Sequence, residues 1–148
     1  MTAALGELQV KVGETVRFSK TVGESDVYMF AGITGDLAPV HVNESYMQNS
    51  AYGRRIAHGV LMVGFMSTCS SIVVAGKGAA SEGEVPVSLG YDRIRFLKPV
   101  FINDTVTVTY KIVEVDNERR RSRSEIQVVN QDGELVCVAE HILKWVQK

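Results

Sequence analysis

The chain has 148 residues, 45% hydrophobic and 22% charged, with a formal net charge of −1. This length and composition are typical of one globular domain, and we expect residues 1–148 to form a single domain. The near-neutral charge speaks against nucleic acid as a partner, and no stretch is apolar enough over enough residues to predict a membrane span.

Before residue 60 the pattern predicts one short strand followed by helices. Residues 12–22 mix Thr, Val and Phe, as strands do. Residues 23–34 begin with a polar helix start and continue with apolar or small residues at helical spacing. That helix should end near Gly35, and Pro39 indicates that the chain has left it. One or two further helical turns are expected over 43–49, with Asn43 as their cap.

Residues 59–75 predict a long helix that is apolar or small on nearly every side. A helix without a charged face is expected to be buried on all sides. Gly76-Lys77-Gly78 should end it.

The second half of the chain predicts strands. Residues 105–115 alternate between apolar and polar side chains, and further strands are expected over 85–96, 121–129 and 134–146. The turn 130–133 offers a glycine for a hairpin between the last two strands. We therefore predict an α+β fold in which an antiparallel sheet wraps around a central buried helix.

Residues 30–41 hold the densest group of reactive side chains. Asp36 and His41 lie five residues apart, after a predicted helix end and on either side of Pro39. A turn stiffened by proline can aim both side chains at one point. Hydration of a 2-enoyl thioester removes a proton from the attacking water and delivers one to C2. A carboxylate and an imidazole can divide these two tasks.

The start of the long helix offers a third function. Gly59 follows His58, and the first turn of a helix has free N–H groups and a positive dipole end. A glycine at this point lets a ligand approach the backbone closely. His58 and Gly59 are therefore candidates for binding the thioester oxygen.

Each candidate also has a structural interpretation. Asp36 fits an ordinary turn, His41 an exposed loop, and His58 a packing or capping position before a helix. His141 lies on the apolar side of a predicted strand, and we interpret it as a buried core or interface histidine.

A resemblance adds to this interpretation. Residues 30–41, followed by 57–59, resemble the MaoC-like dehydratase family, which includes the R-specific enoyl-CoA hydratases. Residues 93–100 and 103–105 also resemble the strand region of that family. The chain departs from the family pattern at Ala38, where an asparagine is usual, and at Gly64, where several members carry a serine.

The loss of the asparagine leaves three explanations open. These are weaker preorganisation, a different substrate, and compensation by Asn43 or Ser45.

The resemblance implies a hot-dog fold and an R-specific enoyl-CoA hydratase acting on short or medium acyl chains. Asp36 and His41 would act together on the catalytic water, and Gly59 would donate to the thioester carbonyl. It also implies a homodimer or higher homo-oligomer, with acyl-CoA as substrate and neither cofactor nor metal. The alternatives are an acyl-CoA thioesterase on the same fold and a non-catalytic subunit of a heteromeric dehydratase, which Ala38 favours.

The phosphate groups of CoA are negatively charged, so we expect Arg or Lys side chains to bind them. Arg54 and Arg55 lie close in sequence to the proposed donor helix and are the better candidates. Lys98 is another. The arginine-rich run 119–123 is interpreted instead as a solvated strand edge.

The two cysteines fit a reducing compartment. Cys69 and Cys137 each lie in an apolar stretch and are interpreted as small buried hydrophobic residues. Residues 1–10 show no signal peptide, so a cytoplasmic location is expected.

Overall fold

The computed structural model describes residues 6–75, 77 and 83–148. Its elements, in chain order, are β1 (Thr15–Thr21), α1 (Glu24–Thr34), α2 (Pro39–Val42), α3 (Glu44–Met47), α4 (Gly59–Val74), β2 (Glu84–Phe96), β3 (Thr105–Asp116), β4 (Arg121–Val129) and β5 (Leu135–Gln147).

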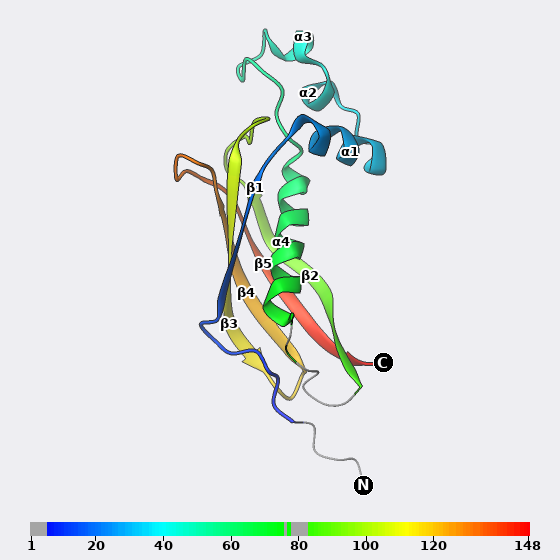
Figure 1. Ribbon diagram of the computed structural model, residues 1–148, viewed down its shortest axis with the longest axis vertical. Coiled ribbons are helices and arrows are strands. Elements are labelled where there is room, and N and C mark those ends of the chain that lie inside the picture. Colours follow the sequence, from blue (N-terminus) through cyan, green and yellow to red (C-terminus); the bar gives the residue numbers. More distant parts are fainter. Residues whose placement is uncertain (1–5, 76, 78–82) are drawn as a thin grey trace.

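The five strands form one antiparallel sheet in the order β1-β3-β4-β5-β2. The alternation predicted for β3 is confirmed, because Val106, Val108, Tyr110 and Ile112 are all fully buried. Gly133 has a φ of 74°, which the turn between β4 and β5 requires. The sheet curves along α4, and the predicted α+β architecture is confirmed (Figure 1).

The long apolar helix α4 packs against one face of the sheet and supplies much of the core. Met62, Met66, Cys69 and Val73 of this helix are each 1% exposed or less. The expectation that it is buried on all sides is wrong for the single chain, because Val60 is 55% exposed. The sheet covers only one side of the helix, and a row of small and apolar residues faces outward.

The helices α1, α2 and α3 gather beyond the N-terminal end of α4 (Figure 1). The predicted end of α1 is confirmed, since Gly35 caps it with a φ of 81°. Asn43 also caps as predicted, its side-chain oxygen accepting from the N–H of Tyr46. Pro39, expected only to lie outside a helix, begins α2, where its missing N–H costs nothing.

The two cysteines are free and buried, as predicted. Burial raises the pKa of both the Cys69 and Cys137 thiols to about 11, so they stay protonated at neutral pH. Of the helices in the described ranges, none has the length and apolarity that crossing a membrane requires. The predicted stop at 76–78 lies outside the described residues, apart from Lys77.

The arginine-rich run matches the expected solvated edge only in part, because Arg119 and Arg121 are exposed but the run does not lie on an edge strand. The strand that continues it, β4, lies between β3 and β5 rather than at the sheet's edge. Arg120 is only 6% exposed, and its guanidinium bonds both carboxylate oxygens of Glu84, at 3.0 and 2.5 Å. Arg123 pairs with Glu114 and Glu140. The ion pairs of Arg123 connect neighbouring strands, and the guanidinium groups of Arg120 and Arg123 are both already paired with carboxylates.

Candidate active site

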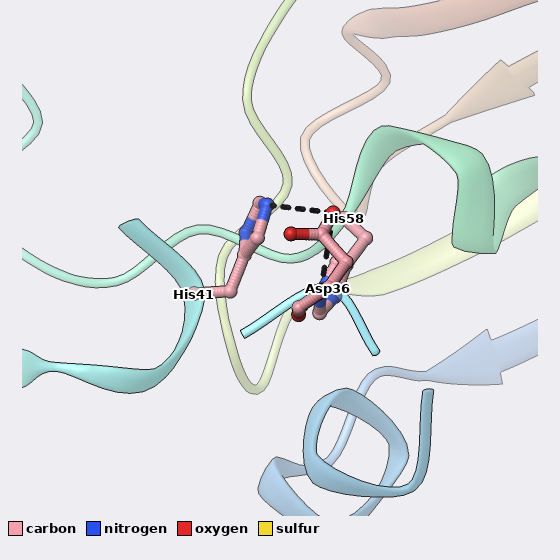
Figure 2. Close-up of side chains that lie close together, drawn as sticks. All are labelled: Asp36, His41 and His58. Atoms are coloured by element: carbon pink, nitrogen blue, oxygen red, sulfur yellow. Dashed lines mark hydrogen bonds and ion pairs between the residues drawn. The ribbon is translucent and has the colours of Figure 1, made fainter. Parts of the chain in front are cut away.

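Three predicted side chains meet at the N-terminal end of α4 (Figure 2). Asp36 comes from the loop after α1, His41 from α2, and His58 is the residue before α4. The Oδ2 atom of Asp36 lies 4.0 Å from Nε2 of His41 and 3.9 Å from Nε2 of His58. The local turn expected from the sequence thus brings the acid and the imidazole to one place.

Short-range hydrogen bonds shape the loop that carries Asp36. Its backbone N–H donates to the hydroxyl of Thr34 at 3.2 Å, and its Oδ1 accepts from the N–H of Ala38 at 3.3 Å. The carboxylate remains 51% exposed. The side-chain oxygen of Asn43 is used to cap α3 and not to support this loop.

His41 has one of its ring nitrogens fixed by the backbone. Its Nδ1 lies 2.7 Å from the carbonyl oxygen of Ile56. Because a carbonyl can only accept, Nδ1 carries the proton and the neutral ring presents the lone pair of Nε2 towards Asp36. The sequence offered no signal for this contact, since any residue at position 56 supplies the same carbonyl.

His58 lies behind His41. The two rings stack with centroids 3.8 Å apart and planes 28° apart, and Phe30 lies against His58 at 4.6 Å. The Nε2 of His58 lies 3.0 Å from the backbone carbonyl of Asp36. Only 1% of the His58 side chain is exposed.

A pocket of about 290 Å³ opens beside His41 and Gly59. Its walls are mostly apolar, and the residues lining it are His41, Tyr52, Ile56, Ala57, Gly59, Met62, Phe96, Leu97, Lys98, Pro99, Val100 and Val136. His58, predicted to contact substrate, is not among them, and neither is Asp36. Lys98 was already a candidate for the CoA phosphates, and Phe96 lies within a stretch noted for its resemblance. No signal in the sequence pointed to Tyr52, Ile56, Met62 and Val136.

Gly59 is necessary for a reason that the sequence did not reveal. A Cβ added there would lie 2.9 Å from the ring of Phe96. The close approach that a glycine permits is therefore made by this ring, at the edge of the pocket. Gly59 begins α4, so its N–H is among those that the helix itself leaves without a partner.

Asp36, His41 and His58 are also of the residue types that bind metal ions. One possible ligand atom from each lies within 4.8 Å of the other two. However, Nε2 of His58 donates to the backbone carbonyl of Asp36, so this nitrogen has no lone pair to offer a metal ion. This geometry fits proton transfer better than coordination.

The two candidate arginines differ sharply. Arg55 donates to Glu44, Glu24 and Tyr28 at 2.7, 2.5 and 2.8 Å, and hydrogen bonds to Glu24 and then Glu44 raise its pKa above the usual range. This guanidinium ties α1 and α3 to the segment before α4, so its donors are already used. Arg54 is exposed, with its guanidinium 3.9 Å over the ring centre of Phe101.

A curved antiparallel sheet packed on one long helix defines a hot-dog-fold protein, and the acid–histidine pair at the end of that helix is its candidate acid–base site. Residues 7–134 match the model of the MaoC like domain, and the chain belongs to this family.

Named relatives agree with this assignment. The chain is 37% identical over 111 residues to an "(R)-specific enoyl-CoA hydratase" of Rhodospirillum rubrum, covering 75% of this chain and 72% of that one. It is 35% identical to a "3-hydroxybutyryl-CoA dehydratase" of Methylorubrum extorquens, over 77% and 68% of the two chains. The solved (R)-hydratase of A. caviae, described as involved in PHA biosynthesis, superposes with a TM-score of 0.81 at 26% identity, over 92% and 97%. The predicted family and hot-dog fold are confirmed.

Proposed function

We propose that this protein catalyses the R-specific hydration of trans-2-enoyl-CoA to (R)-3-hydroxyacyl-CoA and the reverse dehydration. The observation that carries the proposal is the convergence of Asp36 and His41 at 4.0 Å, with His41 on the wall of an apolar pocket. Relatives that are 37% and 35% identical are named for this hydration and for the corresponding dehydration.

The tautomer of His41 assigns the first proton transfer. With Nδ1 bonded to the Ile56 carbonyl, Nε2 is free to take a proton from water as the oxygen attacks C3. The separation of 4.0 Å from the Asp36 carboxylate is too long for a direct hydrogen bond, but one water oxygen can contact both groups. The imidazolium that forms is stabilised by this carboxylate, and its proton can then be delivered to C2.

The end of α4 supplies the electrostatic part of the reaction. As C3 is attacked, negative charge moves to the thioester oxygen. The N–H of Gly59 and the positive end of the helix dipole can stabilise that charge. Gly59 lines the same pocket as His41, so one acyl thioester can reach both.

The pocket favours small acyl groups. Its volume of about 290 Å³ is near the lower limit of about 300 Å³ typical of small-molecule sites. We therefore keep short to medium chains as the proposed substrates. The chemistry uses only protein groups and water, and we propose that it needs neither cofactor nor metal. The expected outcome is that prolonged treatment with a chelator leaves turnover unchanged.

We also propose that the protein is a homodimer. Val60, Gly64, Ser67 and Ser71 form one outward face of α4, and β2 is an edge strand with Val87 and Leu89 half exposed. A second copy would cover this face of small side chains and pair the open edge. Light scattering during size-exclusion chromatography should give twice the chain mass of 16.3 kDa. One domain over residues 1–148 and a cytoplasmic location complete the proposal.

The hydration of crotonyl-CoA tests the function directly. We expect loss of the conjugated thioester absorbance and formation of the R-3-hydroxy product by chiral analysis, with no release of free thiol. Thiol release without hydration would indicate a thioesterase. If neither activity appeared across chain lengths, the protein would be a non-catalytic subunit.

A further inference from the structure

His58 is the buried member of the three-residue cluster. Its side chain is 1% exposed, against 12% for His41 and 51% for Asp36. Of the three cluster residues, only His41 lines the pocket. Because its side chain is almost completely buried, His58 cannot contact the substrate, so any effect it has on the reaction must pass through its neighbours.

The contacts of His58 reach both proton-transfer residues. Its Nε2 donates to the backbone carbonyl of Asp36 at 3.0 Å, and its ring face stacks on His41 at 3.8 Å. Phe30 closes the other side. The Nδ1 atom of His58 is buried without a hydrogen-bond partner in the described part of the chain.

The loop after α1 needs such a support. Its internal hydrogen bonds are all to near neighbours, from the N–H of Asp36 to the Thr34 hydroxyl, from the N–H of Leu37 to the Gly35 carbonyl and from the N–H of Ala38 to the Asp36 carboxylate. The side chain at position 38 is a methyl group and cannot bind the loop to the rest of the protein. The bond from His58 spans 22 residues and connects the loop to the rigid start of α4.

We propose that His58 is a positioning residue, which holds the Asp36 loop by its Nε2–H and the plane of the His41 ring by stacking. The inference rests on the proposed hydratase function and assigns His58 a role other than substrate contact. Displacements of about 1 Å in catalytic groups can cost about 10²-fold in rate, so the effect of losing this support should appear in kcat.

Two substitutions separate the contacts. In His58→Gln the amide can still donate to the Asp36 carbonyl, but the stacked ring is lost. In His58→Phe the ring remains and the donor is lost. With crotonyl-CoA, we expect each variant to lose about 10- to 10²-fold in kcat while KM changes less than threefold. Loss of a contact made equally to bound substrate and transition state would raise KM instead, and unchanged kcat in both variants would overturn the proposal.

Nuclear magnetic resonance of ¹⁵N- and ¹³C-labelled protein gives a second readout that does not depend on turnover. In the wild type, His58 should appear as the Nε2–H tautomer. In the variants, the ring nitrogens of His41 and the carboxyl carbon of Asp36 should shift. If the wild type lacked hydratase activity, the proposed function would fail, but these signals would still decide whether His58 positions its neighbours. An Nδ1–H tautomer, or unshifted signals in both folded variants, would remove the role.

Discussion

His141 and His41 differ in how many of their ring nitrogens already have a hydrogen-bond partner. His141, on β5, is fully buried, and its Nδ1 and Nε2 each lie 2.8 Å from a hydroxyl, of Tyr110 and Ser88. Tyr91 stacks on its face at 4.2 Å. His41 has only Nδ1 bonded and turns Nε2 towards Asp36 beside a pocket.

This difference distinguishes His141, which has a structural role, from His41, the candidate for proton transfer. Burial lowers the pKa of His141 to about 4, so at neutral pH it is an uncharged bridge between strands. The interpretation of His141 as a satisfied core residue is confirmed. In the mechanism that we propose, His41 keeps Nε2 available for proton transfer beside the pocket. The same contrast holds for Arg55, whose donors are used, and the exposed Arg54.

Removal of the free groups should have the largest effect on the reaction. We expect Asp36→Asn and His41→Ala each to lower kcat/KM at least ~10²-fold, because each removes a proton-transfer or charge-stabilising group. Steady-state hydration of crotonyl-CoA measures the loss, and circular dichroism confirms that each variant is folded. Turnover at the wild-type level in either variant would remove that residue from the mechanism.

His141 should instead control stability, and in a pH-dependent way. Its folded pKa of about 4 lies below its ordinary value of 6.5, so between these values the unfolded chain binds more protons. The stability contributed by His141 is therefore fully present above pH 6.5 and is lost as the pH drops towards 4, by about 3 kcal/mol at most. Urea unfolding of the wild type and His141→Gln between pH 4 and 7.5 measures the contribution as the difference between their slopes.

The control is the activity of the same variant, because His141→Gln should keep hydration within about threefold of the wild type at pH 7.5. If the slope survives in His141→Gln, the acid lability comes from other groups.

The parts of the fold that follow from side-chain periodicity were predictable. Alternation over 105–115 identified β3 and its buried face, and the end of α1 followed from Gly35. The burial of α4 was overestimated, because an uncharged helix face indicates apolar contact without saying whether the chain itself or a second copy provides it. Val60 is apolar and lies on this helix, yet it is 55% exposed because no other part of the described chain covers it.

The candidate site was predictable where a short motif brings residues together. Asp36 and His41 needed only one turn, so their convergence followed from local chemistry. Contacts that depend on long-range geometry were not accessible. The bond from His41 to the Ile56 carbonyl and the ring of Phe96 over Gly59 arise from segments that only the folded chain brings together. The network around Arg55 was missed for the same reason.

Glycines offer a further contrast between occupied and free space. In Gly59→Ala the new methyl group would meet the Phe96 ring at 2.9 Å, and we expect a loss of about 1–3 kcal/mol in the free energy of unfolding. In Gly32→Ala the methyl group on α1 meets nothing within 4 Å, and the higher helix propensity of alanine should stabilise by up to about 1 kcal/mol. Urea unfolding compares the stabilities of the two variants.

Adding Phe96→Ala to Gly59→Ala should recover part of the lost stability, since the ring that clashes with the new methyl group is gone. Additive losses would show that the ring is not the cause.

Arg54 should give the smallest effect, because an exposed cation contributes only about 0.2–1 kcal/mol to an ion pair. If it contacts a CoA phosphate, Arg54→Ala should raise KM for crotonyl-CoA about two- to fivefold and leave kcat unchanged. The N-acetylcysteamine thioester of crotonate carries no phosphate, so its kinetics should not respond to this substitution.

Arg55→Ala provides the contrasting variant, because the loss of its bonds to Glu24 and Glu44 should lower thermal stability and affect both substrates equally. An equal rise in KM for both substrates in Arg54→Ala would mean that this arginine shapes the pocket and does not bind phosphate.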